Sequence, residues 1–93
     1  MLAISRSSRF KKDVKKLRHN QRLLTELEDV IVMLAQQQPL PERSQDHALV
    51  GGEYDGYRDC HVRPDLMLIY RIIEGQTLEL YLLRVGSHSE LKL

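Results

Sequence analysis

The residues of this sequence best suited to acid–base chemistry are three histidines and one aspartate: His47, His61, Asp65 and His88. They come from three separate segments, namely a polar loop, a strand with the turn that follows it, and the C-terminal tail. An imidazole has a pKa of about 6.5, so at neutral pH it serves as either an acid or a base. Cleavage of RNA by its own 2′-hydroxyl needs both, a base for that hydroxyl and an acid for the departing 5′-oxygen. The residue types fit this reaction if one sheet brings the three segments to a common rim.

Two other interpretations of the same four residues stay open. The histidines can be unrelated surface or capping residues, as in many sequences. They can also be metal ligands, since zinc accepts imidazole and carboxylate groups, but the spacing contains no HxH or HExxH pair. We therefore predict no metal site and no cofactor.

The acid–base interpretation also requires positive charge near the phosphorane-like transition state. Arginine supplies it as a planar, permanently charged fork that pairs with phosphate oxygens. Three arginines flank the proposed site: Arg58, Arg63 and Arg84. The alternative for each arginine is a surface ion pair with Asp59, Asp55 or Glu79.

Side chains alternate between the two faces of a strand, and the stretch from Tyr57 to Arg63 has such a pattern. One face would carry Tyr57, Asp59, His61 and Arg63, and the other Arg58, Cys60 and Val62. Cys60 is best explained as a small buried residue on the apolar face. The alternation places Arg58 on the opposite face from His61.

Two helices are predicted after a short first strand at residues 2–5. In the first helix, which Ser7 or Ser8 can cap, apolar residues recur at i, i+4 and i+7 from Phe10. The second begins after Asn20, carries a wider apolar stripe over residues 23–34, and stops before Pro39. The pair predicts an antiparallel helical hairpin.

The C-terminal half predicts a long polar connection over residues 39–56, followed by three strands. A connection of that length in a small domain is usually functional. The strands are expected at Tyr57–Arg63, Leu66–Ile73 and Thr77–Val85, joined by short turns as in an antiparallel meander. The predicted fold class is α+β, with the N-terminal strand and helical hairpin packed on one face of an antiparallel sheet.

Length and composition predict a single domain over residues 1–93. A chain of 93 residues can bury one modest core, and 42% hydrophobic with 29% charged residues is ordinary for a soluble globular protein. One cysteine cannot form an internal disulfide, which fits a reducing compartment. No run of residues is apolar enough for a signal peptide or a membrane span. We therefore predict a cytoplasmic protein with no membrane partner.

Charge is distributed unevenly along the chain. Residues 1–24 hold eight basic side chains and one acidic one, a net +7, whereas the rest holds six basic and twelve acidic, a net −6. This asymmetry predicts a basic surface for a polyanion. Its densest part lies on and after the first helix: Lys11, Lys12, Lys15, Lys16 and Arg18.

Several runs of residues closely resemble motifs of the YafQ branch of the RelE toxin superfamily: Asp46-His47-x-Leu49, Gly56-Tyr57-Arg58-Asp59-x-His61-Val62-x-Pro64-Asp65 and Leu68-Ile69-Tyr70. Gly86-Ser87-His88 matches the Gly-Thr-His ending of that family. Two positions depart from the family, since Leu66 replaces a tryptophan and Lys92 a late aromatic residue. Both aromatics would help to hold RNA bases, so their loss bears on base preference and efficiency more than on the reaction.

The resemblance implies the toxin of a type II toxin–antitoxin pair, a ribosome-dependent mRNA endonuclease that works without metal. It places His47, His61, Asp65 and His88 where the family keeps its catalytic residues. We expect His88, on a mobile tail, to be the general acid and His61 the base, with Asp65 orienting an imidazole or acting as base itself. His47 would hold phosphate, and the acid and base roles can be exchanged.

The resemblance also implies partners. These are a cognate antitoxin, the ribosome and mRNA, with operator DNA reached only through the antitoxin. The basic residues 11–18 would contact ribosomal RNA, the alternative being a merely solvated helix face. Two other functions compete: a toxin like the ParE proteins, which resemble this superfamily and inhibit a protein target such as gyrase, and a module that binds nucleic acid without cleaving it.

Overall fold

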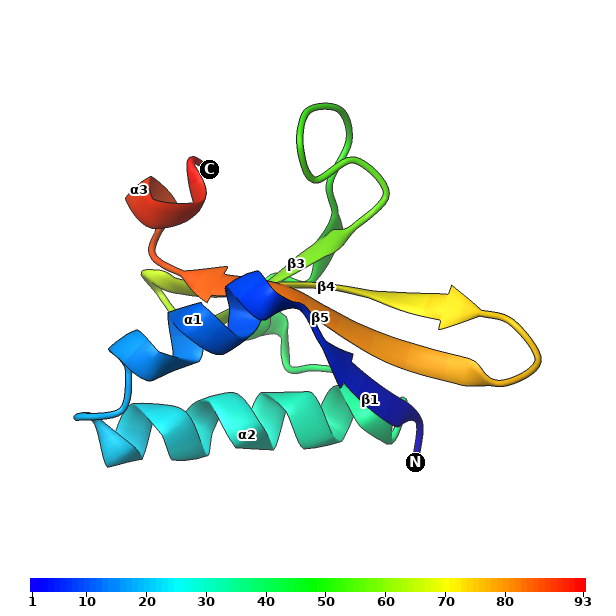
Figure 1. Cartoon of the computed structure of the whole chain (residues 1–93), viewed down its shortest axis with the longest axis horizontal. Helices are drawn as coiled ribbons and strands as arrows, with labels where there is room; N and C mark the ends of the chain where they lie inside the picture. The colour runs from blue at the N-terminus through cyan, green and yellow to red at the C-terminus, as the bar shows by residue number, and fades with distance from the viewer.

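A five-stranded sheet in the order β1-β5-β4-β3-β2 organises the computed structural model, which describes residues 1–93 (Figure 1). Along the chain the elements are β1 (Ala3–Arg6), α1 (Ser8–Lys16), α2 (Gln21–Ala35), the 3₁₀ turn η1 (Glu42–Ser44), β2 (His47–Ala48), β3 (Arg58–Arg63), β4 (Leu66–Glu74), β5 (Leu78–Gly86) and α3 (His88–Leu91). The predicted α+β class is confirmed. The four predicted strands and the two predicted helices lie within a few residues of their expected bounds, and β2 is an additional short strand.

The two long helices begin where their capping residues predict. The Ser7 hydroxyl accepts a hydrogen bond from the backbone N–H of Phe10, and the Asn20 side chain accepts one from Leu23. Figure 1 shows α1 and α2 running in opposite directions on one side of the sheet. The helical hairpin follows directly from the two local apolar stripes and their caps.

The sheet is antiparallel from β2 to β5, but its other edge is not. β1 pairs with β5 in parallel, with Ala3 opposite Glu79 and Arg6 opposite Leu82. The helical hairpin and the meander both separate these strands in sequence, so no short turn dictates their direction. The predicted antiparallel meander is confirmed, and the N-terminal strand, expected on one face of the sheet with the hairpin, instead joins its edge in parallel.

Two apolar clusters lie on opposite faces of the sheet. The larger one, between the sheet and the helices, includes Phe10, Leu27, Cys60 and Leu68. The smaller one covers the far face and consists of Tyr54, Met67, Ile69 and Leu91. β4 contributes to both, which explains why its sequence is apolar without alternation.

The segment predicted as one long polar connection contains two short ordered pieces, η1 and β2. β2 pairs only two residues with β3, His47 with Asp59 and Ala48 with Arg58. This pairing fixes His47 beside the second strand of the predicted site. No helix in the chain has the length and apolar character needed to cross a membrane.

Candidate active site

Three of the four predicted catalytic residues lie together at one end of the sheet. Asp65, in the turn between β3 and β4, accepts hydrogen bonds from the backbone N–H of His88 at 2.9 Å and from its Nδ1 at 2.6 Å. The rings of His61 and His88 meet edge to face, with their centroids 5.7 Å apart and an interplanar angle of 73°. β3, the following turn and α3 thus bring two imidazoles and a carboxylate to one rim.

The contact with Asp65 determines which nitrogen of His88 is free. An ionised carboxylate can only accept, so Nδ1 of His88 donates the hydrogen bond to Asp65. Its other ring nitrogen, Nε2, is left for proton exchange with a substrate. Two hydrogen bonds lower the pKa of the Asp65 carboxyl: the larger effect comes from the His88 backbone N–H and the smaller from the His88 side chain. Asp65 is therefore ionised at neutral pH and suited to orienting the imidazole.

The sequence predicted that His88 lies on a mobile tail. In the structure it lies instead in the short helix α3. α3 begins with a capping box in which Ser87 and Glu90 satisfy each other's backbone N–H groups. Leu91 is buried in the smaller apolar cluster, and its carbonyl accepts a hydrogen bond from the Tyr54 hydroxyl at 3.1 Å. A single helical turn is unstable alone, so these contacts with the sheet hold His88 in place.

His47 lies on β2, the edge strand next to β3. Its Nδ1 lies 2.7 Å from the carbonyl oxygen of Gln45, and its Nε2 lies 3.8 Å from Oδ2 of Asp59. The structure therefore places His47 next to Asp59 and gives it no direct contact with His61 or His88.

Asp59 is a feature of the site to which the sequence analysis assigned no chemical role, although it placed the residue on the His61 face. Only 4% of the residue is exposed, and its Oδ1 has no hydrogen-bond partner. Burial raises the pKa of the Asp59 carboxyl above its ordinary value. Charge on three neighbouring histidines opposes part of this rise: His47, His61 and His88. The available signal was the strand alternation, which put Asp59 on the same face as His61.

Each of the three predicted phosphate-binding arginines is engaged in an ion pair, although not with the acidic residues predicted as alternatives. Arg58 Nε lies 3.2 Å from Asp46, and Arg63 Nε lies 2.5 Å from Glu26. Arg84 Nε lies 2.7 Å from Asp13, with the Arg84 side chain 13% exposed. Arg58 and Arg63 are more accessible, so they retain more capacity to meet a phosphate than Arg84 does.

Arg58 lies on the helix side of the sheet, as alternation predicted. It is paired across the ladder with Tyr70, whose hydroxyl donates a hydrogen bond of 2.6 Å to Asp46. Tyr70 belongs to the larger apolar cluster. Arg58 therefore reaches the edge of the sheet without facing the histidines directly.

The predicted ribosome-contacting residues form an exposed basic group on and just after α1. All five are exposed and none makes an ion pair within the chain: Lys11, Lys12, Lys15, Lys16 and Arg18.

The histidine rim includes suitable metal-ligand types, but no three His, Cys, Asp or Glu side chains come together as a ligand set.

Comparison with known proteins assigns the chain and its fold to a family. The family described as the bacterial toxin of type II toxin–antitoxin systems, YafQ, matches residues 2–93. The mRNA interferase toxin YafQ of Escherichia coli is 35% identical over 89 residues, covering 95% of this chain and 92% of that protein. A putative toxin YafQ of Haemophilus influenzae is 55% identical over 53 residues, and there the match spans 56% of this chain and 51% of the relative.

Solved structures agree with this assignment. A metal-bound toxin from Helicobacter pylori superposes with a TM-score of 0.84 at 47% identity, covering 98% of this chain and 99% of that one. YafQ in the Escherichia coli DinJ–YafQ complex superposes with a TM-score of 0.81 at 34% identity, covering 98% of each chain. Since the family match extends over almost the entire sequence, the chain belongs to the YafQ family of toxins of bacterial type II toxin–antitoxin systems.

Proposed function

We propose that this chain is an endoribonuclease that cleaves mRNA on the ribosome by acid–base catalysis. The observation that carries the proposal is the contact of His88 with Asp65 beside His61, which provides two imidazoles and one orienting carboxylate. The relatives named mRNA interferase toxins support the same activity. The chain would act in the cytoplasm.

In the proposed reaction His61 takes the proton of the 2′-hydroxyl, whose oxygen then attacks the adjacent phosphorus. The bond from phosphorus to the 5′-oxygen breaks, and His88 donates a proton to that oxygen through Nε2. Asp65 keeps Nδ1 of His88 protonated, so the opposite nitrogen handles the exchange. His47 binds the phosphate from the β2 side, with Arg58, Arg63 and Arg84 as the candidate sources of further positive charge.

Dependence on the ribosome is supported by what the chain lacks. It contains no tryptophan, and two of its four tyrosines, Tyr54 and Tyr70, are buried. Stacking of a base on an aromatic side chain contributes about 1–3 kcal/mol to single-strand binding. With few such platforms the chain would hold free RNA weakly, and a ribosome presenting an immobilised codon would supply the missing order.

Replacement of the cleaved nucleotide by its 2′-deoxy form tests the chemistry. We expect this substitution to abolish cleavage on programmed ribosomes, because it removes the attacking oxygen. The same substitution one nucleotide away is the control and should leave cleavage intact. Addition of a zinc or copper chelator should not change the rate, provided that enough Mg²⁺ remains to hold the ribosome together. Cleavage of the 2′-deoxy substrate, or a demand for added metal, would contradict the proposal.

The proposed partner is an antitoxin encoded with this chain, by analogy with DinJ in the DinJ–YafQ complex. Expression of the chain alone should arrest growth, and co-expression of the neighbouring reading frame should restore it. Operator DNA would be bound only through that antitoxin. Arrest that persists in the His88→Gln variant would instead favour a toxin that inhibits a protein target without cleaving RNA.

A further inference from the structure

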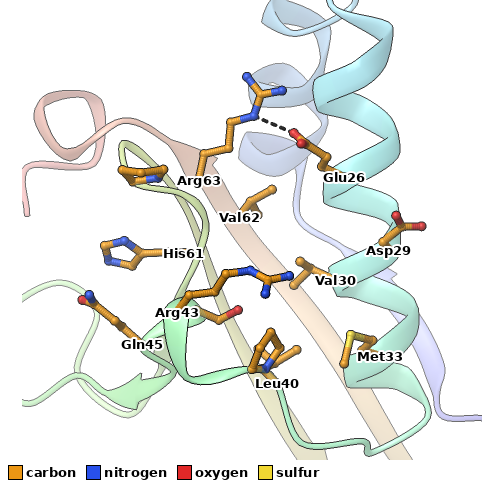
Figure 2. A pocket seen from close by; sticks show the side chains of 13 residues that line it. Glu26, Asp29, Val30, Met33, Leu40, Arg43, Gln45, His61, Val62 and Arg63 are labelled. Carbon is orange, nitrogen blue, oxygen red and sulfur yellow. Dashed lines mark hydrogen bonds and ion pairs between the residues drawn. The ribbon is translucent and has the colours of Figure 1, made fainter.

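The Asp59 carboxylate has no part in the reaction proposed above, although it lies within the candidate active site. Figure 2, which views the pocket between α2 and β3, shows the His61 ring on the opposite side of β3 from Val62 and α2. Asp59 lies two residues before His61 on the same strand, so its side chain points to the same side as that ring. It is also paired with His47 across the ladder between β2 and β3. Asp59 is therefore the neighbour of two proposed catalytic histidines, one along its own strand and one on the adjacent strand.

β2 is anchored by a different aspartate. The strand has two residues, and Oδ1 of the preceding Asp46 accepts hydrogen bonds from the Tyr70 hydroxyl at 2.6 Å and from Nε of Arg58 at 3.2 Å. Asp59 supplies no such bond to β2: its Oδ1 has no partner, and its Oδ2 lies 3.8 Å from Nε2 of His47. Only 4% of the residue is exposed, so the missing partner costs free energy of folding. The contacts of Asp59 thus show no structural task that would offset this cost.

Both ring nitrogens of His47 face oxygen atoms. Nδ1 lies 2.7 Å from the carbonyl oxygen of Gln45, which can only accept, so Nδ1 carries a proton. Nε2 faces Oδ2 of Asp59. In a neutral ring with its proton on Nδ1, Nε2 is an acceptor, and an ionised carboxylate is an acceptor too. The approach of Nε2 to Oδ2 is therefore favourable only when one proton lies between the two atoms.

That proton can sit on either partner. On Asp59 it makes both groups neutral, and on His47 it makes an imidazolium paired with a carboxylate. Burial raises the pKa of the Asp59 carboxyl, and positive charge on His47 is the largest effect that opposes this rise. A bound phosphate favours the imidazolium arrangement, because the charged ring then lies between two negative groups. The separation of 3.8 Å can shorten at that stage, since hydrogen bonds in active sites are often long before the substrate binds.

A second aspartate–histidine pair in the same site shows what such a carboxylate does. Asp65 accepts a hydrogen bond from Nδ1 of His88 at 2.6 Å and so fixes the orientation of that ring. The two carboxylates differ in burial: the side chain of Asp65 is 70% exposed, whereas that of Asp59 is 6% exposed. Solvent therefore screens the charge of Asp59 far less, and at a given distance its influence on an adjacent imidazole is stronger.

We infer that Asp59 is a positioning residue for His47: it holds Nε2 of the ring and balances its charge, so that His47 meets the cleaved phosphate as an oriented cation. The inference rests on the proposed function, because it concerns how the same cleavage reaction stabilises its phosphate. His61 and His88 keep the two proton transfers of that reaction. Asp59 itself is too buried to touch the RNA, so it acts through His47.

A double-mutant cycle between positions 59 and 47 tests the inference. The measured quantity is kcat/KM for cleavage of mRNA on programmed ribosomes. Asp59→Asn keeps the shape of the side chain and removes its charge, so we expect a loss of about tenfold, within the range of energies that couple neighbouring residues. In the His47→Ala background the same substitution should cause no further loss, because the residue through which Asp59 acts is gone. The control is Asp29→Asn, the same exchange at an exposed carboxylate of α2 that makes no ion pair, and it should leave cleavage unchanged.

A second variant separates positioning from folding. Asp59→Ala removes the atoms that face Nε2, so the NMR signals of the His47 ring should show greater mobility, while those of the His88 ring keep the mobility of the wild type. Denaturant unfolding establishes that each variant folds. Three results would each overturn the inference and leave the nuclease standing: an equally large loss from Asp59→Asn in the His47→Ala background, full activity in Asp59→Asn, or an unaltered His47 ring in Asp59→Ala. Absence of cleavage by the wild-type chain would instead defeat the proposed function, and the inference with it.

Discussion

The carboxylate of Asp59 is buried in the sheet with one oxygen unpartnered and three histidines nearby. A buried polar atom without a hydrogen bond costs free energy of folding, so its retention points to a role in the site. Its Oδ2 lies 3.8 Å from Nε2 of His47. At the scale of single residues, the Asp59 carboxylate therefore lowers the free energy of unfolding.

The raised pKa of Asp59 gives a stability prediction with a definite sign. The folded chain binds this proton more tightly than the unfolded chain, so the contribution to stability is complete below the unfolded pKa and is lost as pH rises through the folded pKa. Asp59→Asn should therefore raise the free energy of unfolding at pH 7 by about 1 kcal/mol, the scale of one unsatisfied buried group. The gain should shrink toward pH 4, and nuclease activity should fall. Denaturant unfolding from pH 4 to pH 8 measures it, and a variant less stable than wild type at pH 7 would contradict it.

At the scale of elements, α3 depends on contacts from distant parts of the chain. It has four residues, and its position relies on its capping box, on the burial of Leu91 and on the Tyr54 hydroxyl. The same cluster joins the loop before β3 to the far face of β4. This small apolar cluster therefore positions His88 although none of its members takes part in the chemistry.

Tyr54→Phe tests that positioning role. Loss of the hydroxyl leaves the Leu91 carbonyl without its partner, at a cost of about 1 kcal/mol, which lowers the docked fraction of α3 relative to the undocked one about fivefold. We expect reduced cleavage, greater mobility of the His88 ring signals in NMR spectra, and a melting temperature lower by about 4–8 °C. Tyr81→Phe, whose hydroxyl makes no hydrogen bond within the chain, is the control. Full activity in Tyr54→Phe would show that α3 does not need this bond.

The ion pair of Asp13 with Arg84 joins α1 to β5. Asp13 is 5% exposed and accepts two hydrogen bonds from the arginine and one from the backbone N–H of Val85. Asp13→Ala leaves a partly buried guanidinium without its partner and should cost about 3 kcal/mol of stability. Glu53→Ala, which breaks the exposed pair with Arg9, should change unfolding little. Equal midpoints for the two variants in urea unfolding would contradict the structural role of Asp13.

At the scale of the whole molecule, the basic surface and the histidine rim are built from different elements. Lys11, Lys12, Lys15 and Lys16 lie on α1, whereas the rim is built from β2, β3, the β3–β4 turn and α3. The rim can therefore act on one polyanion while the helix contacts another. This arrangement supports docking on ribosomal RNA through α1 and cleavage of mRNA at the rim.

Charge reversal on α1 tests this division. Substitution of Lys12, Lys15 and Lys16 by Glu should weaken ribosome binding and reduce the slope of log K against log salt by about 1 for each lost phosphate contact. The fold and the histidine geometry should persist, because all three side chains are exposed. Binding measured by ribosome sedimentation from 50 to 200 mM salt provides the readout, with the ranges chosen around physiological ionic strength, about 150 mM. An unchanged salt dependence would mean that α1 is only a solvated face.

The elements that local patterns specify were predictable from the sequence. The apolar stripes and capping residues of α1 and α2 act within a few residues of chain, and short turns join the strands of the meander. The fold class and the face of β3 that carries His61 follow from the same local periodicity. The motifs around His47, His61, Asp65 and His88 identified the family, since they are runs of adjacent residues.

Only the tertiary structure decided which groups meet across long stretches of chain. Arg84 pairs with a residue 71 positions away, and Asp65 contacts His88 23 positions away. The parallel direction of β1, the anchoring of α3 and the burial of Asp59 depend likewise on how helices and strands stack. Alternation assigns a side chain to a face, but it does not say what covers that face. Burial and the contacts between distant residues arise from packing of the whole chain, and they set the charge states on which the proposed chemistry depends.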